Sequence, residues 1–193
     1  MAMWNPWRGC HKCSEGCKFC YIHKGDLKRG IDTNNIVKTE KFTTPIDKNK
    51  KGEYRIKSGQ LVFLCFLSDF LLADADQWRE ECWDMIKERS DLHFLFLTKR
   101  IDRFAQCIPA DWNGGYKNVA VGGESDYNAR PFDYDWVLSL RQQCVNTNTN
   151  FEFRQCGTNF IKDGIQYKLN VRQLCSQAKK AEINYYNTYR KGY

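Results

Sequence analysis

Long hydrophobic runs are absent from this sequence of 193 residues. The longest apolar stretch, residues 61–67, is far shorter than the roughly 20 residues that a membrane-spanning helix needs. The N-terminus has neither a charged leader nor a small-residue cleavage site, so we expect a cytoplasmic protein without a secretory signal and without a membrane partner. Histidine is also scarce, and His11, His23 and His93 form no metal-binding pattern.

The composition is that of a folded protein. Hydrophobic residues make up 42% of the chain and charged residues 27%, which excludes a wholly disordered or collagen-like protein. No internal repeat or linker is visible, so we expect a single domain over residues 1–193. Its expected parts are a cysteine loop (1–23), a basic insertion (24–60), strand–helix units (61–160), and a C-terminal helical region with a tail (161–193).

The net charge of +7 is unevenly distributed. Residues 24–60 hold ten Lys or Arg against five Asp or Glu, and residues 161–193 hold seven against two. Residues 61–160 are acidic, with ten against fifteen. The two basic segments either attract an anionic partner such as nucleic acid or form an ordinary solvated surface.

Apolar periodicity predicts alternating strands and helices. We expect strands at 61–67, 92–97, 118–121 and 151–153, and helices at 74–88, 101–107, 134–144 and 168–183. The run at 61–67 has the length and continuity of a parallel strand buried on both faces. Alternation of this kind predicts an α/β fold with a mainly parallel sheet, whose ligands bind at the carboxyl ends of the strands.

Each expected strand ends in polar residues suited to that edge. Lys99 and Arg100 are candidates to bind a carboxylate or phosphate, or else form a surface pair. Asp69 either orients a substrate hydroxyl or caps the following helix. The full set of candidate cofactor-binding residues at strand ends is Ser68, Asp69, Lys99, Arg100, Gly122, Gly123, Glu124, Arg130 and Gln155.

Four of the ten cysteines, Cys10, Cys13, Cys17 and Cys20, fall within eleven residues. Clustered cysteines in a reducing compartment typically bind metal. The spacing of Cys13, Cys17 and Cys20 suits three thiolates on a [4Fe-4S] cluster whose fourth iron stays free to bind S-adenosylmethionine. Cys10 leaves two metal-binding alternatives open: a Cys10/Cys17/Cys20 set, and a four-thiolate site that holds zinc or a closed cluster. The remaining alternative is plain reduced thiols that bind no metal.

The sequence resembles a phage-associated, radical-SAM-like family of unknown function. The resemblance lies in residues 4–10 (WNPWRGC) and 16–21 (GCKFCY), and continues at 68–70, 97–104, 121–125, 129–137, 155–157 and 177–181. It implies a partial (β/α) barrel of the radical SAM type and a cluster held by Cys10, Cys17 and Cys20. Phe19 and Tyr21, which flank Cys20, are candidate cofactor contacts.

Two features depart from this family. Cys13 stands where the family usually has an aliphatic residue, which is why the ligand set stays open. Between residues 118–119 and 121–123, longer relatives carry additional residues equivalent to two more strands, so we expect a shortened barrel. Gly122-Gly123-Glu124 resembles the turn with which radical SAM enzymes bind the methionine amino group, although it falls late in this chain.

These observations favour an iron–sulfur protein that binds S-adenosylmethionine and a reductant such as flavodoxin or ferredoxin. Its radical chemistry would act on an unknown, nucleic-acid-related substrate in a bacterial or phage-infected cell. The alternative is a non-catalytic nucleic-acid-binding or phage–host interaction module with a structural zinc site.

Overall fold

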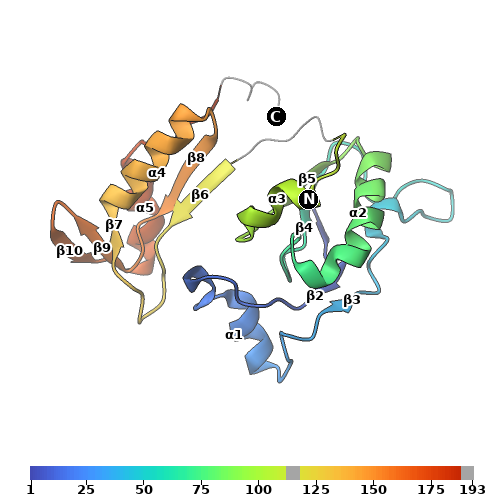
Figure 1. Ribbon diagram of the computed structural model, residues 1–193, viewed down its shortest axis with the longest axis horizontal. Helices are drawn as coiled ribbons and strands as arrows, with labels where there is room; N and C mark the ends of the chain where they lie inside the picture. Colours follow the sequence, from blue (N-terminus) through green and yellow to red (C-terminus); the bar gives the residue numbers. More distant parts are fainter. Residues whose placement is uncertain (112–117, 188–193) are drawn as a thin grey trace. The chain divides into compact units, whose positions relative to one another are not determined.

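The structure is a computed structural model that describes residues 1–111 and 118–187. Contacts group the chain into two compact units, Met1–Trp112 and Asn113–Tyr193 (Figure 1). Each unit has its own apolar core and is described by itself. The prediction from the sequence that residues 1–193 form a single domain stays a prediction.

The first unit is built on a parallel sheet. Its strands are β1 (Ala2–Trp4), β4 (Leu61–Leu64) and β5 (His93–Phe96), in the order β1-β4-β5. Val62 and Leu64 of β4 are fully buried on one face, whereas Leu61 and Phe63 on the other face are half-buried. The expectation that this strand is buried on both faces is therefore wrong, because only one face is fully covered.

Two helical segments follow these strands. After the short 3-10 turn η3 (Ala73–Ala75), helix α2 (Asp76–Glu88) buries side chains at helical spacing. After β5 come η4 (Ile101–Arg103) and α3 (Phe104–Cys107), so both predicted helices are confirmed. The core that they share with the sheet includes Trp4, Trp7, Leu64, Phe70, Leu71, Cys82, Trp83 and Met85.

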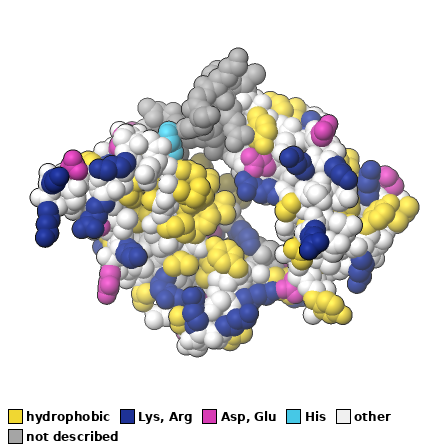
Figure 2. Space-filling model, turned by 180° about the vertical axis from the view of Figure 1, so that it is seen from behind, with side chains coloured by type: hydrophobic (Ala, Val, Ile, Leu, Met, Phe, Trp, Pro, Cys, Tyr) yellow, Lys and Arg dark blue, Asp and Glu magenta, His cyan; other side chains and the backbone are white. Residues whose placement is uncertain are grey.

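The opposite face of the sheet is uncovered within the first unit. Met3, Phe63 and Leu95 lie in register across β1, β4 and β5. The exposed fraction is 51% for Met3 and 38% for Leu95. Figure 2 shows hydrophobic side chains gathered on this unit.

The N-terminal region has more regular structure than the sequence predicts. Strand β2 (Trp7–Arg8) pairs antiparallel with β3 (Val37–Lys38), η1 (Glu15–Cys17) lies within the cysteine loop, and α1 (Tyr21–Lys28) follows it. Helix α1 has a weak sequence signal because it buries only Ile22 and Asp26. Further along, η2 (Thr44–Ile46) precedes a lysine-rich hairpin, which is closed by the antiparallel bridge between Lys48 and Tyr54.

The second unit combines a parallel pair of strands with two helices. Strand β6 (Asn118–Gly122) runs parallel to β8 (Asn150–Gln155). Helices α4 (Tyr134–Asn146) and α5 (Val171–Lys180) both contact β8. These four predicted elements are confirmed, and their core includes Val137, Cys144, Phe151, Phe153, Cys156, Phe160 and Ala178.

A second sheet in this unit corrects the prediction of a purely helical region from residue 161. Strand β7 (Phe132–Asp133) pairs in parallel with β9 (Asn159–Lys162), which forms an antiparallel hairpin with β10 (Ile165–Lys168). The turn is Asp163-Gly164, with φ of 52° and 74°. Asp-Gly favours such left-handed two-residue turns, so the signal was present in the sequence. The last part of the predicted tail, residues 188–193, lies outside the described residues.

The fold is mixed α/β with small parallel sheets. The described strands form two three-stranded and two two-stranded sheets, and none of these closes into a barrel. The α/β class is therefore confirmed. Over residues 1–111 and 118–187, every helix is too short or too polar to cross a membrane.

A buried carboxylate fastens α1 to the start of the chain. Asp26 is 2% exposed and accepts hydrogen bonds from Arg8 Nη2 at 2.9 Å and from Arg29 Nη2 at 2.6 Å. Burial alone would raise the pKa of Asp26, but hydrogen bonds from Arg29 and Thr33 and the charge of Arg8 lower it below its ordinary value. Folding therefore favours the ionised carboxylate.

We expect Asp26→Asn to lower the free energy of unfolding by about 1–2 kcal/mol at neutral pH, since partly exposed arginines share this charge. The folded pKa is depressed, so the stabilisation is present above the unfolded value of about 3.9 and is lost as pH falls through the folded value. Urea unfolding at pH 7 and near pH 3 measures the difference, with exposed Asp84→Asn as control. A difference of equal size at both pH values would contradict this account.

Candidate metal centre at the cysteine loop

The part of the cysteine loop that carries the four cysteines, residues 9–20, begins at a tightly packed glycine. Gly9 has φ of +90°, and a Cβ there would lie 2.5 Å from the Asn35 carbonyl oxygen. The backbone N–H of Cys10 donates to the Thr33 carbonyl at 2.8 Å, and the Ser68 hydroxyl donates to the Gly9 carbonyl. Only glycine fits this turn, so the entry to the loop is fixed.

The four thiols differ in exposure. Cys10 and Cys17 are buried, Cys20 is half-buried, and Cys13 is exposed. The sulfur atoms of Cys13 and Cys17 lie 3.9 Å apart. Among the described residues, no three His, Cys, Asp or Glu side chains are grouped to hold a metal ion. The fold thus brings the predicted ligands into one loop but not into one coordination sphere.

The loop rests on the carboxyl ends of β4 and β5. Beyond β4, the Phe66 carbonyl accepts a hydrogen bond from the Tyr21 hydroxyl at 2.6 Å. Beyond β5, Lys99 Nζ donates to the Gly16 carbonyl at 2.5 Å, and Arg100 Nη2 donates to the His11 carbonyl at 2.6 Å. Lys99 and Arg100 therefore anchor the loop, at the sheet edge where ligands bind in parallel α/β folds.

Asp69 joins the two strand ends. Its Oδ1 accepts from the Leu71 N–H at 2.9 Å and from the Thr98 hydroxyl at 2.8 Å. Its Oδ2 accepts from the Lys99 N–H at 3.1 Å and from Arg100 Nη1 at 3.2 Å. These four bonds use the carboxylate within the protein. Neither η3 nor α2 is capped by a side chain, so the expectation that Asp69 caps the following helix is wrong, and a contact with a substrate hydroxyl stays a prediction. Thr98 was not predicted, although it is one more polar residue at a strand end.

The charge of Arg100 reaches the first cysteine. Arg100 Nη1 lies 3.7 Å from the Cys10 sulfur, and both side chains are buried. Burial raises the pKa of the Cys10 thiol above its ordinary value, and the positive charge of Arg100 opposes that rise. Arg100 is thus the nearest compensating charge for a thiolate at Cys10.

Cys17 is the most acidic of the loop thiols with a resolved pKa shift. Burial acts to raise its pKa, but hydrogen bonds from the backbone of Cys13 and Ser14 and the charge of Lys99 lower the pKa to about 7. A large fraction of Cys17 is therefore thiolate at neutral pH, the form that binds metal.

The donor set fits a thiolate-bound metal group. Thiolates are the ligands of iron–sulfur clusters and of structural zinc, and here they lie beside the cations of Lys99 and Arg100. A hollow of about 500 Å³ adjoins the loop, and its lining consists of Lys12, Ser14, Glu15 and Lys18 without any of the four cysteines. A one-metal site would place sulfur atoms about 3.8 Å apart, given Zn–S bonds of about 2.3 Å, and Cys13 and Cys17 are near this value.

The aromatic residues of the N-terminal motif have different environments. Phe19 lies near two cations, with Lys18 Nζ 5.6 Å and Lys24 Nζ 4.9 Å from its ring centroid. Trp7 is fully buried and stacks on Phe70, with 5.5 Å between ring centroids. Trp4 is also fully buried and donates to the Phe42 carbonyl at 2.8 Å. Both tryptophans pack the core of the first unit.

The remaining candidates lie in the second unit, where β6 and β8 end. Glu124 is engaged by Arg130, whose backbone N–H and Nε each donate to it at 2.9 Å. Gln155 Nε2 donates to the Gly123 carbonyl at 2.6 Å. A Cβ on Gly122 would lie 2.8 Å from the Gln155 side chain. Glu124 thus pairs with Arg130, and Gln155 lies against Gly122 and Gly123, and the role of these five residues as cofactor ligands stays a prediction.

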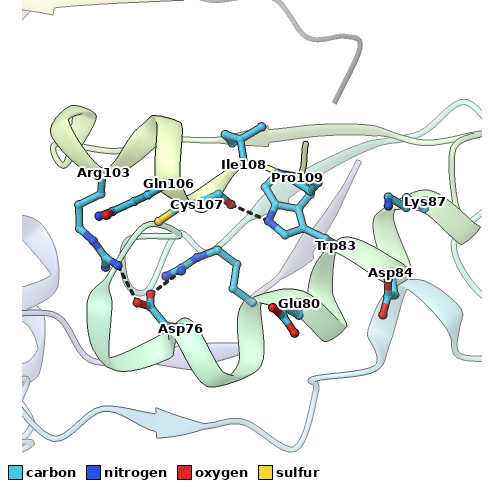
Figure 3. Close-up of a pocket in the computed structure, with 11 residues that line it drawn as sticks. Asp76, Glu80, Trp83, Asp84, Lys87, Arg103, Gln106, Cys107, Ile108 and Pro109 are labelled. Carbon is cyan, nitrogen blue, oxygen red and sulfur yellow. Dashed lines mark hydrogen bonds and ion pairs between the residues drawn. The ribbon is translucent and has the colours of Figure 1, made fainter. Parts of the chain in front are cut away.

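Another hollow of the first unit, of about 480 Å³, is separate from these residues (Figure 3). It lies between α2 and the segment from Arg103 to Pro109. Asp76 forms ion pairs there with Arg79 and Arg103, and Trp83 Nε1 donates to the Cys107 carbonyl at 2.9 Å. None of the candidate site residues lines it, so it has no part in the site.

A comparison with models of protein families assigns the chain to a family. Residues 1–119 and 110–187 match the family described as "Protein of unknown function (DUF5131)". Because these segments together span residues 1–187, the chain belongs to this family. No curated protein and no solved structure matches the chain.

Substitutions at Gly122 and Gly123 test how closely the backbone segments of this unit approach each other. A Cβ on Gly123 would lie 2.6 Å from the Cys156 carbonyl oxygen and 2.8 Å from Gly157 Cα, which are backbone atoms. We expect Gly123→Ala to lower the free energy of unfolding by about 1–3 kcal/mol. Gly122→Ala should lower it less, because it meets the Gln155 side chain, which can rotate. Chemical denaturation measures both, and equal effects would contradict the close backbone approach.

Proposed function

We propose that this chain is an iron–sulfur protein of the radical SAM type, an internally shortened form of the kind associated with phages. The observation that carries the proposal is the cysteine loop at the carboxyl edge of a parallel sheet, with buried Arg100 at 3.7 Å from the Cys10 sulfur. The cell compartment that suits reduced thiols is the cytoplasm.

The chemistry comes from the bound group. When bound, a [4Fe-4S] cluster with one iron free of protein ligands supplies an electron to the sulfonium of S-adenosylmethionine, which releases methionine and a 5′-deoxyadenosyl radical. A flavodoxin or ferredoxin would supply that electron. The two basic segments favour a nucleic-acid-related substrate.

The protein's own residues would hold and shield this chemistry. Cys10, Cys17 and Cys20 are the ligands that we propose, because Cys10 and Cys17 are buried and Cys13 is exposed. Lys99 and Arg100 hold the loop against the sheet through backbone carbonyls. The uncovered face of β1, β4 and β5 that carries Met3, Phe63 and Leu95 offers an apolar surface for an organic ligand.

The partial barrel belongs to the same proposal. Each unit by itself contains parallel strands, β1-β4-β5 in the first and β6-β8 in the second, and the strands of a (β/α) barrel are parallel. The two segments matched to the family overlap at residues 110–119, next to the point where the resemblance implies missing strands. A shortened barrel would leave a wider rim for a large substrate.

The test is metal and product analysis of protein purified without oxygen. We expect about four irons and four sulfides per chain, and a visible spectrum that S-adenosylmethionine perturbs. Under reduction, the protein should release 5′-deoxyadenosine and methionine. A loaded cluster that never yields either product would refute the radical chemistry.

Single substitutions identify the ligands. Cys10→Ser, Cys17→Ser and Cys20→Ser should each lose most of the iron, whereas Cys13→Ser should keep it. Cys175→Ser, an exposed cysteine of the second unit, is the matched control. Loss of iron from Cys13→Ser with retention in Cys10→Ser would instead assign Cys13, Cys17 and Cys20.

A second candidate is a nucleic-acid-binding module with structural zinc. The separation of 3.9 Å between the Cys13 and Cys17 sulfur atoms favours it, because two ligands of one tetrahedral metal lie about this far apart. Three exposed lysines, Lys48, Lys50 and Lys51, lie on the hairpin that would meet phosphates. Metal analysis would then find one zinc and no iron.

This candidate predicts salt-dependent binding to DNA or RNA. Binding of fluorescent oligonucleotides should weaken steeply as salt rises, because phosphate contacts release counterions. Replacing the three hairpin lysines with glutamine should weaken binding and lower the logarithmic salt slope by about 0.9 for each phosphate that the variant no longer neutralises. Affinity that is indifferent to salt would exclude this function.

A further inference from the structure

We propose that Arg100 is a positioning residue of the cysteine centre, whose charge holds Cys10 as a metal ligand and sets the reduction potential of the bound group. The part of the inference that concerns the reduction potential rests on the proposed function. The part that concerns metal retention applies to any metal held by Cys10. Three contacts carry it: Arg100 Nη1 to Asp69 Oδ2 at 3.2 Å, Nη1 to Cys10 Sγ at 3.7 Å, and Nη2 to the His11 carbonyl at 2.6 Å.

Through these contacts, one guanidinium group binds both the sulfur of Cys10 and the backbone carbonyl of the following residue, His11. Arg100 holds the side chain of Cys10 and the backbone of the next residue, so the direction of the sulfur is fixed relative to the strand end. Asp69 in turn fixes Arg100 and is itself held by Thr98 and by the Lys99 N–H. Groups that orient metal ligands in this way often change metal affinity 10- to 100-fold when they are removed.

A thiolate at Cys10 would also need a positive charge close to its sulfur atom. Asp69 and Arg100 are 5% and 8% exposed and neutralise each other while Cys10 carries its proton. Metal binding replaces that proton and leaves an additional buried thiolate. Arg100 is the charged side chain within hydrogen-bonding distance of this sulfur, and low-dielectric surroundings strengthen its effect.

The same unit contains a matched control. Arg79 is 5% exposed, forms an ion pair with Asp76, and donates to the Phe70 carbonyl at 2.9 Å and the Leu72 carbonyl at 2.5 Å. It therefore shares with Arg100 burial, an aspartate partner and backbone acceptors. No contact joins it to a cysteine of the loop within the described part of the chain.

The experiment compares Arg100→Gln, Arg100→Lys and Arg79→Gln with the wild type, each purified without oxygen as the full chain. Three quantities are measured: metal per chain, the rate of metal release to a chelator, and the midpoint potential of the iron centre by EPR-monitored titration. Thermal unfolding of each variant reports the purely structural cost.

We expect Arg100→Gln to release metal at least about tenfold faster and to shift the midpoint potential to a more negative value. The shift is negative because removal of a nearby positive charge disfavours the more negative, reduced state. Arg100→Lys should keep most of the potential but release metal faster than the wild type, since lysine lacks the planar fork. Arg79→Gln should lower the unfolding temperature and leave release rate and potential unchanged.

The outcomes separate this inference from the proposed function. Equal release rates and potentials for Arg100→Gln, Arg79→Gln and the wild type would overturn it. If Arg100→Gln does not fold, Arg100→Lys decides, and wild-type release from that variant would overturn the inference. Zinc in place of iron would refute the radical function while release rates still decide the role of Arg100. A wild type without metal would overturn both.

Discussion

The buried ion pair between Asp69 and Arg100 connects the sheet of the first unit to the cysteine loop. Its carboxylate ties the end of β4 to the end of β5, and its guanidinium reaches Cys10 and the His11 carbonyl. Breaking one partner of such a pair typically costs about 3–5 kcal/mol, because the remaining charge stays buried. The position of the loop and the connection between the two strand ends thus depend on the same ion pair.

The cysteine loop has little regular structure of its own, so its shape comes from what holds it. Gly9 turns the chain at its start, the strand ends hold its middle through Lys99 and Arg100, and Tyr21 fastens its end to the Phe66 carbonyl. A loop held by backbone carbonyls can turn its thiols toward a metal without losing these anchors. These anchors hold the four cysteines in one loop, although among the described residues their thiols are not gathered into one coordination sphere.

The second unit shows how a motif can serve packing. Gly123 and Gly157 let two backbone segments approach to a distance that no side chain would allow. Glu124, which resembles an ammonium-binding residue by sequence, is engaged by Arg130. Sequence spacing identifies residues of a useful chemical type, but it does not tell whether a neighbour already uses them.

The sequence by itself determined most of the periodic elements, because β4, α2, β5, α4 and α5 each bury a continuous or regularly spaced apolar set. It also determined the cysteine cluster and the polar strand ends, since both are local patterns. Short elements such as β1 and α1 depend on partners distant in sequence and carried no such signal. Only the tertiary structure decided that Thr98, Asp69 and Arg100 form one network with Cys10, because long-range ion pairs and hydrogen bonds leave no period in a sequence.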